Sequence, residues 1–449
     1  MHLSKLWVVF ASLAAPSLMS PNQMLAQYTH WLNVNCALTA DSPPVYRSID
    51  SALSAATDRT GIYVLPGSVC KEQVSIGTLS NVGVVTDQGS TFKVVGSVNI
   101  QASNSVYIYG AQISNSSGNG IDVNSSRAVT LDDCGSSNNA GLGLNVNTSE
   151  VTVNHTGSFD YNGGGGVFAG LNSTLYFSGW WPNIGVQFEM IGNTGSGLHI
   201  DRAVFESTGS TTIANTVPAS GGVFPDAFGI IEFGGSNGGL FGFTGPNSVT
   251  NNAGGGIFIG EKSEFSVGGG LSWAPHGNLI QGNGPYGIFE EFGSQVTVFG
   301  ATQILDHTIA GVDIYSNSQA SIYGSNQISH NGTSTDPSRS GILVEGNSQA
   351  YVRGATISQN GGPGILDLVN SSVDLTGASF ASNAGSSVTC DGTAVLKSDL
   401  SPSALGSSSV CRVSPGGSNQ RISNPTTPIT NQAQWKAFVK TMRSLDVHH

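Results

Sequence analysis

A four-residue phrase led by glycine, Gly-apolar-x-apolar, recurs along the chain at a nearly fixed interval. The intervals between successive phrases are 23, 23, 31, 32, 27, 31, 24, 30 and 23 residues. A base period near 23 residues, lengthened in some copies, indicates a repeat architecture. The phrases begin at Gly120, Gly143, Gly166, Gly197, Gly229, Gly256, Gly287, Gly311, Gly341 and Gly364, and the fourth residue is acidic instead of apolar after Gly229, Gly287 and Gly364.

Each repeat contains two short stretches in which apolar residues alternate with others. Ile121 and Val123 form one such pair, and Val129 and Leu131 form the next. Alternation with a period of two predicts strands. A coil of short strands that climbs by one strand spacing per turn is a parallel β-helix. We therefore predict an all-β fold, a single-stranded parallel β-helix or solenoid, over residues 91–400.

The composition agrees with this architecture and excludes some partners. Glycine makes up 61 of 449 residues, which suits a chain with several sharp corners in every repeat. A hydrophobic content of 38% argues against disorder. The net charge is −12 and no basic run exists, so we expect no nucleic-acid partner.

The N-terminus has the features of a secretory signal peptide. Lys5 is the only early charge, and the apolar stretch from Leu6 to Ala15 is too short to span a bilayer. We predict cleavage after Ala26 and an exported protein that is secreted, extracellular, periplasmic or on the cell surface, with no transmembrane span. The alternative is a buried first strand.

Five cysteines are compatible with export. Cys36 and Cys70 flank the first segment of the coil, and Cys390 and Cys411 flank the last. A cross-link at each end would restrain turns that have a neighbour on one side only, so we predict these two pairs as disulfides. Cys134 is left over and is expected to be a small buried residue.

Residues 43–56 break the strand rhythm. Ile49, Ala52, Leu53 and Ala56 fall on one face at helical spacing. We predict a short amphipathic helix there, which would cover the open N-terminal end of the hydrophobic column.

The sequence YRSIDSALSAATDRTGIYVLPGSVCKEQVSI, residues 46–76, resembles the N-terminal part of pectin-lyase-like right-handed parallel β-helix proteins. The repeats extend this resemblance to about residue 400. It implies a right-handed coil. It leaves function open, because the superfamily includes lyases, hydrolases, esterases, epimerases, adhesins and surface proteins.

The expected organisation has four parts. The tail is rich in Ser and Pro, and Trp435, Phe438, Met442 and Leu445 lie on one face of a helix predicted over 431–445. This helix would either cap the coil or bind a partner. The parts are a signal peptide (1–26), an N-terminal cap with the first turns (27–90), the β-helix repeats (91–400) and the tail with its C-terminal helix (401–449).

Catalytic motifs of the superfamily are mostly absent. A polygalacturonase-like site would call for Asn-Thr-Asp, Asp-Asp, Gly-His-Gly and Arg-Ile-Lys on successive turns. The chain has only Asp132-Asp133, which we interpret as a solvated turn. Residues 128–337 contain just two cations, Arg202 and Lys262, too few for a pectate-lyase-like elimination.

The x positions of the repeat phrase point out of the coil. On five neighbouring turns the residues there are apolar or aromatic, and the insertions in the same turns contain tryptophans. Either the insertions fold back and bury this stripe, or the stripe is an open aromatic platform for sugar rings. The stripe includes Ile231, and the candidate ligand-binding residues are Phe168, Trp180, Trp181, His199, Phe258, Trp273 and Phe289.

Carboxylates occur near the stripe. Equivalent positions on neighbouring turns lie ~4.8 Å apart, and two turns give ~9.6 Å, distances that suit the acid–base pairs of glycosidases. Such a stack would also suit Ca²⁺, and we predict no other cofactor. Glu232 would face inward unless a bulge intervenes. The candidate catalytic residues are Asp201, Glu232, Glu290 and Glu291.

Two functional hypotheses follow for the same flank of the coil. The first is a non-catalytic surface or carbohydrate-binding protein, which the missing motifs favour. The alternative is a polysaccharide-degrading enzyme, similar to glycoside hydrolases, that uses a carboxylate pair. In both, the partner is a polysaccharide or a cell-surface glycan.

Overall fold

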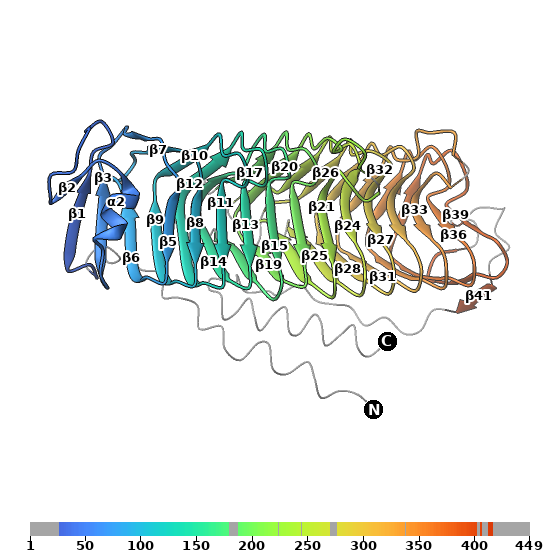
Figure 1. Ribbon diagram of the computed structural model, residues 1–449. Helices are drawn as coiled ribbons and strands as arrows, with labels where there is room; N and C mark the ends of the chain where they lie inside the picture. The colour runs from blue at the N-terminus through green and yellow to red at the C-terminus, as the bar shows by residue number, and fades with distance from the viewer. Residues whose placement is uncertain are drawn as a thin grey trace, which may run out of the picture.

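The computed structural model shows a long coil of parallel strands stacked along one axis (Figure 1). It describes residues 27–401, 405 and 412–415, apart from 179–186, 223, 244, 270–275 and 337. The predicted parallel β-helix is therefore confirmed. The signal peptide and the helix predicted over 431–445 lie outside the described residues. No helix in the described part has the length and hydrophobicity of a membrane span.

The repeat phrases form one face of the coil, a sheet of 13 parallel strands that we call face one. Its register stacks Ile257 on Ile288 and Ile288 on Val312, as the repeat predicts. The strands are β5 (Val74–Gly77), β8 (Val98–Gln101), β11 (Ile121–Asn124), β13 (Leu144–Asn147), β15 (Val167–Gly170), β18 (Leu198–Asp201), β21 (Phe228–Phe233), β24 (Gly255–Ile259), β27 (Tyr286–Glu290), β30 (Ala310–Ile314), β33 (Ser340–Val344), β36 (Ile365–Asp367) and β39 (Val388–Cys390).

The strand that follows in each turn belongs to a second stack, face two. At its N-terminal end β1 also pairs with the short strand β2 (Val45–Tyr46). The strands are β1 (His30–Val34), β3 (Thr60–Val64), β6 (Ser80–Val85), β9 (Asn104–Tyr109), β12 (Arg127–Ser137), β14 (Glu150–Ser158), β16 (Thr174–Ser178), β19 (Val204–Ser207), β22 (Asn237–Phe241), β25 (Glu264–Gly269), β28 (Gln295–Gly300), β31 (Gln319–Tyr323), β34 (Gln349–Arg353), β37 (Ser372–Thr376), β40 (Val395–Ser398) and β41 (Arg412–Pro415).

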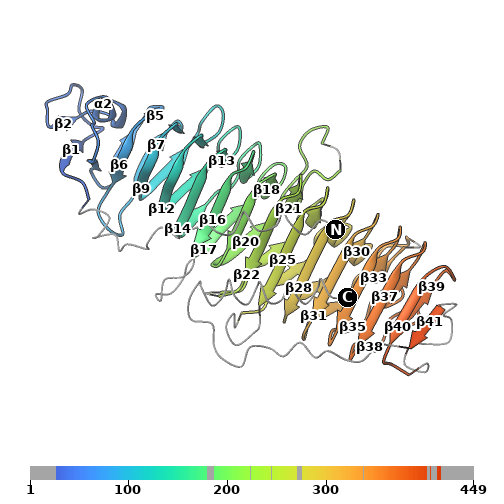
Figure 2. The same ribbon diagram turned by 90° about the horizontal axis from the view of Figure 1, so that it is seen from below.

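The strands that follow face two in each turn form a third stack, face three, which lies before the next strand of face one along the chain (Figure 2). The strands β12 and β14 are long enough to pass from face two into face three without a break, which joins the two faces into one sheet. The other strands are β4 (Val69–Cys70), β7 (Phe92–Val95), β10 (Ala111–Ser114), β17 (Gln187–Ile191), β20 (Ser210–Ala214), β23 (Ser248–Thr250), β26 (Leu279–Gln281), β29 (Gln303–Leu305), β32 (Gln327–Ser329), β35 (Thr356–Ser358) and β38 (Ser379–Ala381).

The inward residues of the three faces form one continuous hydrophobic core from Val34 to Leu405. Polar columns accompany it at the corners. The Oδ1 of Asn162 accepts from the backbone N–H and the Nδ2 of Asn139 at 3.1 and 2.9 Å. The backbone N–H of Asn162 donates in turn to the Oδ1 of Asn193 at 2.8 Å. Each asparagine thus satisfies backbone groups that strand pairing leaves free at the corner.

A serine column does the same at another corner. The backbone N–H of Ser103 donates to the Oγ of Ser126, and that of Ser126 donates to the Oγ of Ser149. The N–H of Ser149 donates to the Oγ of Ser173 at 3.2 Å. These bonds connect residues about one repeat apart, so they lock neighbouring turns in register.

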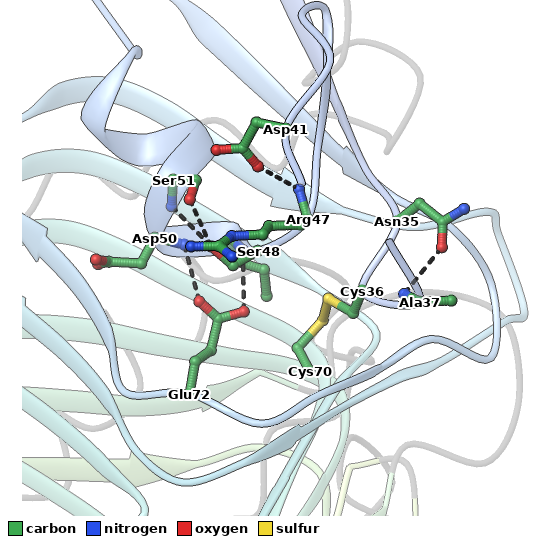
Figure 3. The surroundings of a disulfide bond; sticks show 11 residues. Asn35, Cys36, Ala37, Asp41, Arg47, Ser48, Asp50, Ser51, Cys70 and Glu72 are labelled. Carbon is green, nitrogen blue, oxygen red and sulfur yellow. Dashed lines mark hydrogen bonds between the residues drawn. A yellow bond between two sulfur atoms is a disulfide. The ribbon is translucent and has the colours of Figure 1, made fainter. Parts of the chain in front are cut away.

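A short helix, α2 (Ile49–Ser54), lies inside the segment where helical spacing was noted. Its N-cap is Ser48, whose hydroxyl accepts from the N–H of Ser51 at 3.0 Å. The carboxylate of Glu72 accepts from the N–H groups of Ile49 and Asp50 at 2.9 Å each (Figure 3). A carboxylate is favoured at this end of a helix because the free N–H groups point toward it.

The predicted disulfide between Cys36 and Cys70 is confirmed, and it joins the N-terminal segment to face three beside Glu72 (Figure 3). Cys134 is a buried free thiol, as expected. Cys390 is also disulfide-bonded. Cys411, its predicted partner, lies outside the described residues.

The asparagine columns predict a large effect from one substitution. Asn162→Ala should destabilise the protein by roughly 2–4 kcal/mol, because buried donors on Asn139 lose their acceptor. Asn104→Ala, at an exposed strand start, should change stability by less than about 0.5 kcal/mol. Urea unfolding of both variants tests this, and equal midpoints would show that the column does not stabilise the coil.

Candidate functional site

The outward aromatic stripe on face one is covered. Ile231, Phe258 and Phe289 pack with Phe228 in a small buried cluster outside the coil. The ring of Phe224, from the insertion before β21, lies 5.4–5.5 Å from the rings of the phenylalanines in this cluster. The insertion therefore folds back over the stripe, which excludes an open platform formed by Phe258 and Phe289.

Two of the remaining ligand-binding candidates are described by the structure. Phe168 and His199 are half-buried neighbours whose rings meet edge to face at 5.2 Å. Burial lowers the pKa of His199. Trp180, Trp181 and Trp273 lie outside the described residues.

Two of the four predicted catalytic carboxylates do not lie on the flank. In the register of face one, Glu232 and Glu290 occupy the inward column shared with Ile259. Both are fully buried. The prediction that Glu232 and Glu290 lie on the outer surface is therefore wrong. No bulge turns their side chains outward in β21 or β27.

The other two carboxylates are half-buried at the surface. Asp201 pairs with its neighbour Arg202 at 2.9 Å. Glu291 is at the corner after β27, and burial together with Glu261 raises its pKa. Their catalytic role stays a prediction.

The inward carboxylates give the protein a pH-dependent stability. Burial raises the pKa of Glu232 well above its ordinary value, and the charge of Glu264 adds to this. The folded state therefore keeps this proton at pH values where the unfolded chain has released it. The contribution of Glu232 to stability should be greatest below about pH 4.3, the ordinary carboxyl pKa, and should fall as pH rises toward the raised value.

Glu232→Leu should remove this dependence, since leucine has a similar volume and does not ionise. The free energy of unfolding of the parent should decline relative to the variant by up to about 1.4 kcal/mol per pH unit above the ordinary carboxyl pKa. Glu150→Leu, on the outer side of β14, serves as the control. Thermal unfolding between pH 4 and 8 measures the difference, and parallel curves for parent and Glu232→Leu would contradict it.

A different cluster lies on the outer side of the coil, where face two meets face three. Asp132 and Asp133 are in β12, and His155 is in β14 on the next turn. The register between these strands shifts between Asp132 and Cys134, so β14 has one residue more than β12. Such bulges re-aim side chains. Here the extra residue brings the His155 ring back to Asp132.

Both oxygens of Asp132 are engaged. Its Oδ1 lies 2.5 Å from the Nδ1 of His155, and its Oδ2 accepts from the hydroxyl of Tyr107 at 2.8 Å. Asp133 accepts from the hydroxyl of Thr156 at 3.0 Å. The Asp132 side chain is 4% exposed and that of His155 is 33% exposed. The Asp132 carboxylate is therefore buried, and the His155 imidazole is the part of this pair that contacts solvent.

The surroundings of the cluster shift the pKa values of two of its groups upward. The hydrogen bond to Asp132 raises the pKa of His155, against the opposing effect of burial. Burial raises the pKa of Tyr107, and the charge of Asp132 adds to this, so the phenol remains a donor. One ligand atom each of Asp132, Asp133 and His155 lies within 4.8 Å of the others, close enough for the three to hold one cation.

The sequence contained a signal for this cluster that the motif comparison missed. Asp132 and His155 are 23 residues apart, which is the base period of the repeat. Residues one period apart lie on neighbouring turns, so a search for polar residues at that spacing would have paired them.

Comparisons with known proteins found similar chains among solved structures. No protein-family profile matches the chain, and the search of curated proteins found no match. The A-module of Azotobacter vinelandii mannuronan C-5 epimerase AlgE4 is 14% identical with a TM-score of 0.40, covering 75% of this chain and 90% of that one. Pectate lyase Pel9A is 9% identical with a TM-score of 0.29, covering 79% and 77%.

A family 28 exopolygalacturonase from Yersinia enterocolitica is 13% identical with a TM-score of 0.26, covering 80% of this chain and 78% of that one. At such identities and TM-scores the likeness concerns the fold alone.

Proposed function

We propose that the protein is a polysaccharide-acting enzyme whose acid–base group is formed by Asp132, Asp133 and His155. The observation that supports this is the bulge in β14, which turns a partly exposed imidazole onto a buried carboxylate. A histidine oriented by a carboxylate, with a second carboxylate beside it, is an arrangement suited to proton transfer. The polygalacturonase-like pattern also places Asp-Asp and His on successive turns, although the glycines around the histidine are absent here.

The chemistry we propose is hydrolysis of a glycosidic bond. Asp132 holds the Nδ1 proton of His155, which leaves Nε2 to exchange a proton with a ligand. One group of the cluster would protonate the leaving glycosidic oxygen, and a carboxylate would take a proton from the attacking water. The water then supplies the hydroxyl of the new reducing end.

We propose a neutral glycan as the substrate. Among the described residues, no Lys or Arg forms a salt bridge with Asp132 or Asp133, so the cluster offers no paired cation to hold a uronate. The net charge of −12 would also repel a uronate polymer. We further propose export, which the Cys36–Cys70 disulfide supports because such bonds persist in oxidising compartments.

The alternative, a non-catalytic carbohydrate-binding protein, would use the aromatic stripe on face one. The cover formed by Phe224 weakens that reading. The proteins of similar fold named above are titled as polysaccharide-acting enzymes, but the proposal depends on the cluster.

Asp132→Asn and Asp133→Asn should each lower turnover by about 10²–10⁴-fold. The assay is a panel containing α-1,3-glucan, polygalacturonate and alginate, read for new reducing ends and for unsaturated products. Asp122→Asn is a matched control, because Asp122 is on face one of the same turn and its oxygen accepts from Asn119 and Asn145. Full activity in both cluster variants would refute the proposed site, and unsaturated products would refute hydrolysis.

The raised pKa of His155 predicts the alkaline side of the pH profile. If protonated His155 is the acid, activity should persist above the ordinary histidine pKa of about 6.5 and then fall as the proton is lost. His155→Gln should remove that alkaline limb while retaining residual activity. An unchanged limb in the variant would assign the limb to another group.

A further inference from the structure

The outer surface of face two has an aromatic row on the N-terminal side of the cluster. Trp31 is 40% exposed, whereas Tyr28 is buried. Their rings meet edge to face at 5.7 Å with an interplanar angle of 86°. The tyrosine therefore supports the tryptophan from one side and leaves part of its indole open to solvent.

Two glycines make room for these rings. A Cβ on Gly61 would lie 2.6–2.8 Å from three atoms of the Trp31 ring. A Cβ on Gly83 would lie 2.6–2.7 Å from three atoms of Tyr28. Real Cβ atoms do not approach rings so closely, so any other residue at either position would displace the ring. The glycines thus let both rings approach the backbone of the sheet closely.

The strand register places this row in line with the cluster. Trp31 pairs with Gly61, Gly61 with Gly83, Gly83 with Tyr107, and Tyr107 with Thr130, two residues before Asp132 on the same strand. These pairings run through β1, β3, β6, β9 and β12. The indole over Gly61 is therefore three strand spacings, about 14 Å, from the turn of the cluster along the coil axis.

Beyond the cluster the same column continues with Thr152 and Tyr176. Thr130 and Thr152 are short, half-buried side chains between the larger Tyr107 and Tyr176. Along this column, the two short threonine side chains beside Asp132 are therefore flanked by a tyrosine on each side.

We propose that Trp31 forms a distal sugar-binding subsite for a glycan that lies along face two and reaches the cluster. This inference rests on the proposed function and specifies how its substrate is held. An indole fixed by packing can stack on the apolar face of a sugar ring with little loss of side-chain entropy. Three strand spacings correspond to several sugar units, so only oligosaccharides above a minimum length would reach both sites.

The test uses variants that remove or displace the indole. Trp31→Ala and Gly61→Ala should each weaken binding of long oligosaccharides roughly five- to tenfold, while binding of the shortest ones stays unchanged. Gly77→Ala is the matched control, because a Cβ there meets no atom within 4 Å. Affinities come from a length series of α-1,3-glucan oligosaccharides, or from electrophoresis through gels containing the polymers of the panel.

The outcomes separate this proposal from the catalytic one. If Asp132→Asn abolishes turnover but Trp31→Ala and Gly61→Ala bind long chains as the parent does, the subsite is wrong and the catalytic cluster stands. If Trp31→Ala weakens binding while Asp132→Asn retains turnover, the subsite stands and the cluster is wrong. Equal losses for long and short oligosaccharides would also overturn the distal position. Gly61→Ala keeps the test valid if Trp31→Ala does not fold.

Discussion

The hydrogen bonds that corner side chains make to the next turn are the interactions on which this structure depends. A coil of this kind has contacts only between neighbouring turns, so each turn must be held in register locally. Sheet pairing does this along the faces and leaves backbone groups free at the corners. Asn139, Asn162 and Asn193 pair those groups from one turn to the next, and the serine column from Ser103 to Ser173 does so elsewhere.

A fixed register turns sequence spacing into position in space. Residues one period apart form columns along the coil, and this brings His155 onto Asp132 and places Trp31 in line with Tyr107. The cluster depends on the bulge between β12 and β14. This bulge adds one residue to β14, and the pairing of the two strands resumes at Cys134 and Gly157. The fixed register of the coil therefore holds the polar side chains of the cluster in place on its surface.

The sequence period was sufficient to predict the strands, the parallel coil and the stacking of the repeat phrases. The period was insufficient to predict whether a given side chain points into the core or out to the surface. Glu232 lies inward because β21 continues without a bulge, a point that alternation alone left open. The path of the insertion bearing Phe224 is likewise not encoded in the period, so the cover over Phe258 could not be chosen in advance. Asp132 was misread as solvated because its partners Tyr107 and His155 are on other turns.

A crystal structure of Asp133→Asn soaked with a long oligosaccharide of the glycan that the protein binds would test the central claim most directly. The account predicts a chain along the outer surface of face two, with a glycosidic oxygen beside Asp132 and His155 and a sugar ring on Trp31. A chain bound on face one against Phe224, or at either end of the coil, would contradict it.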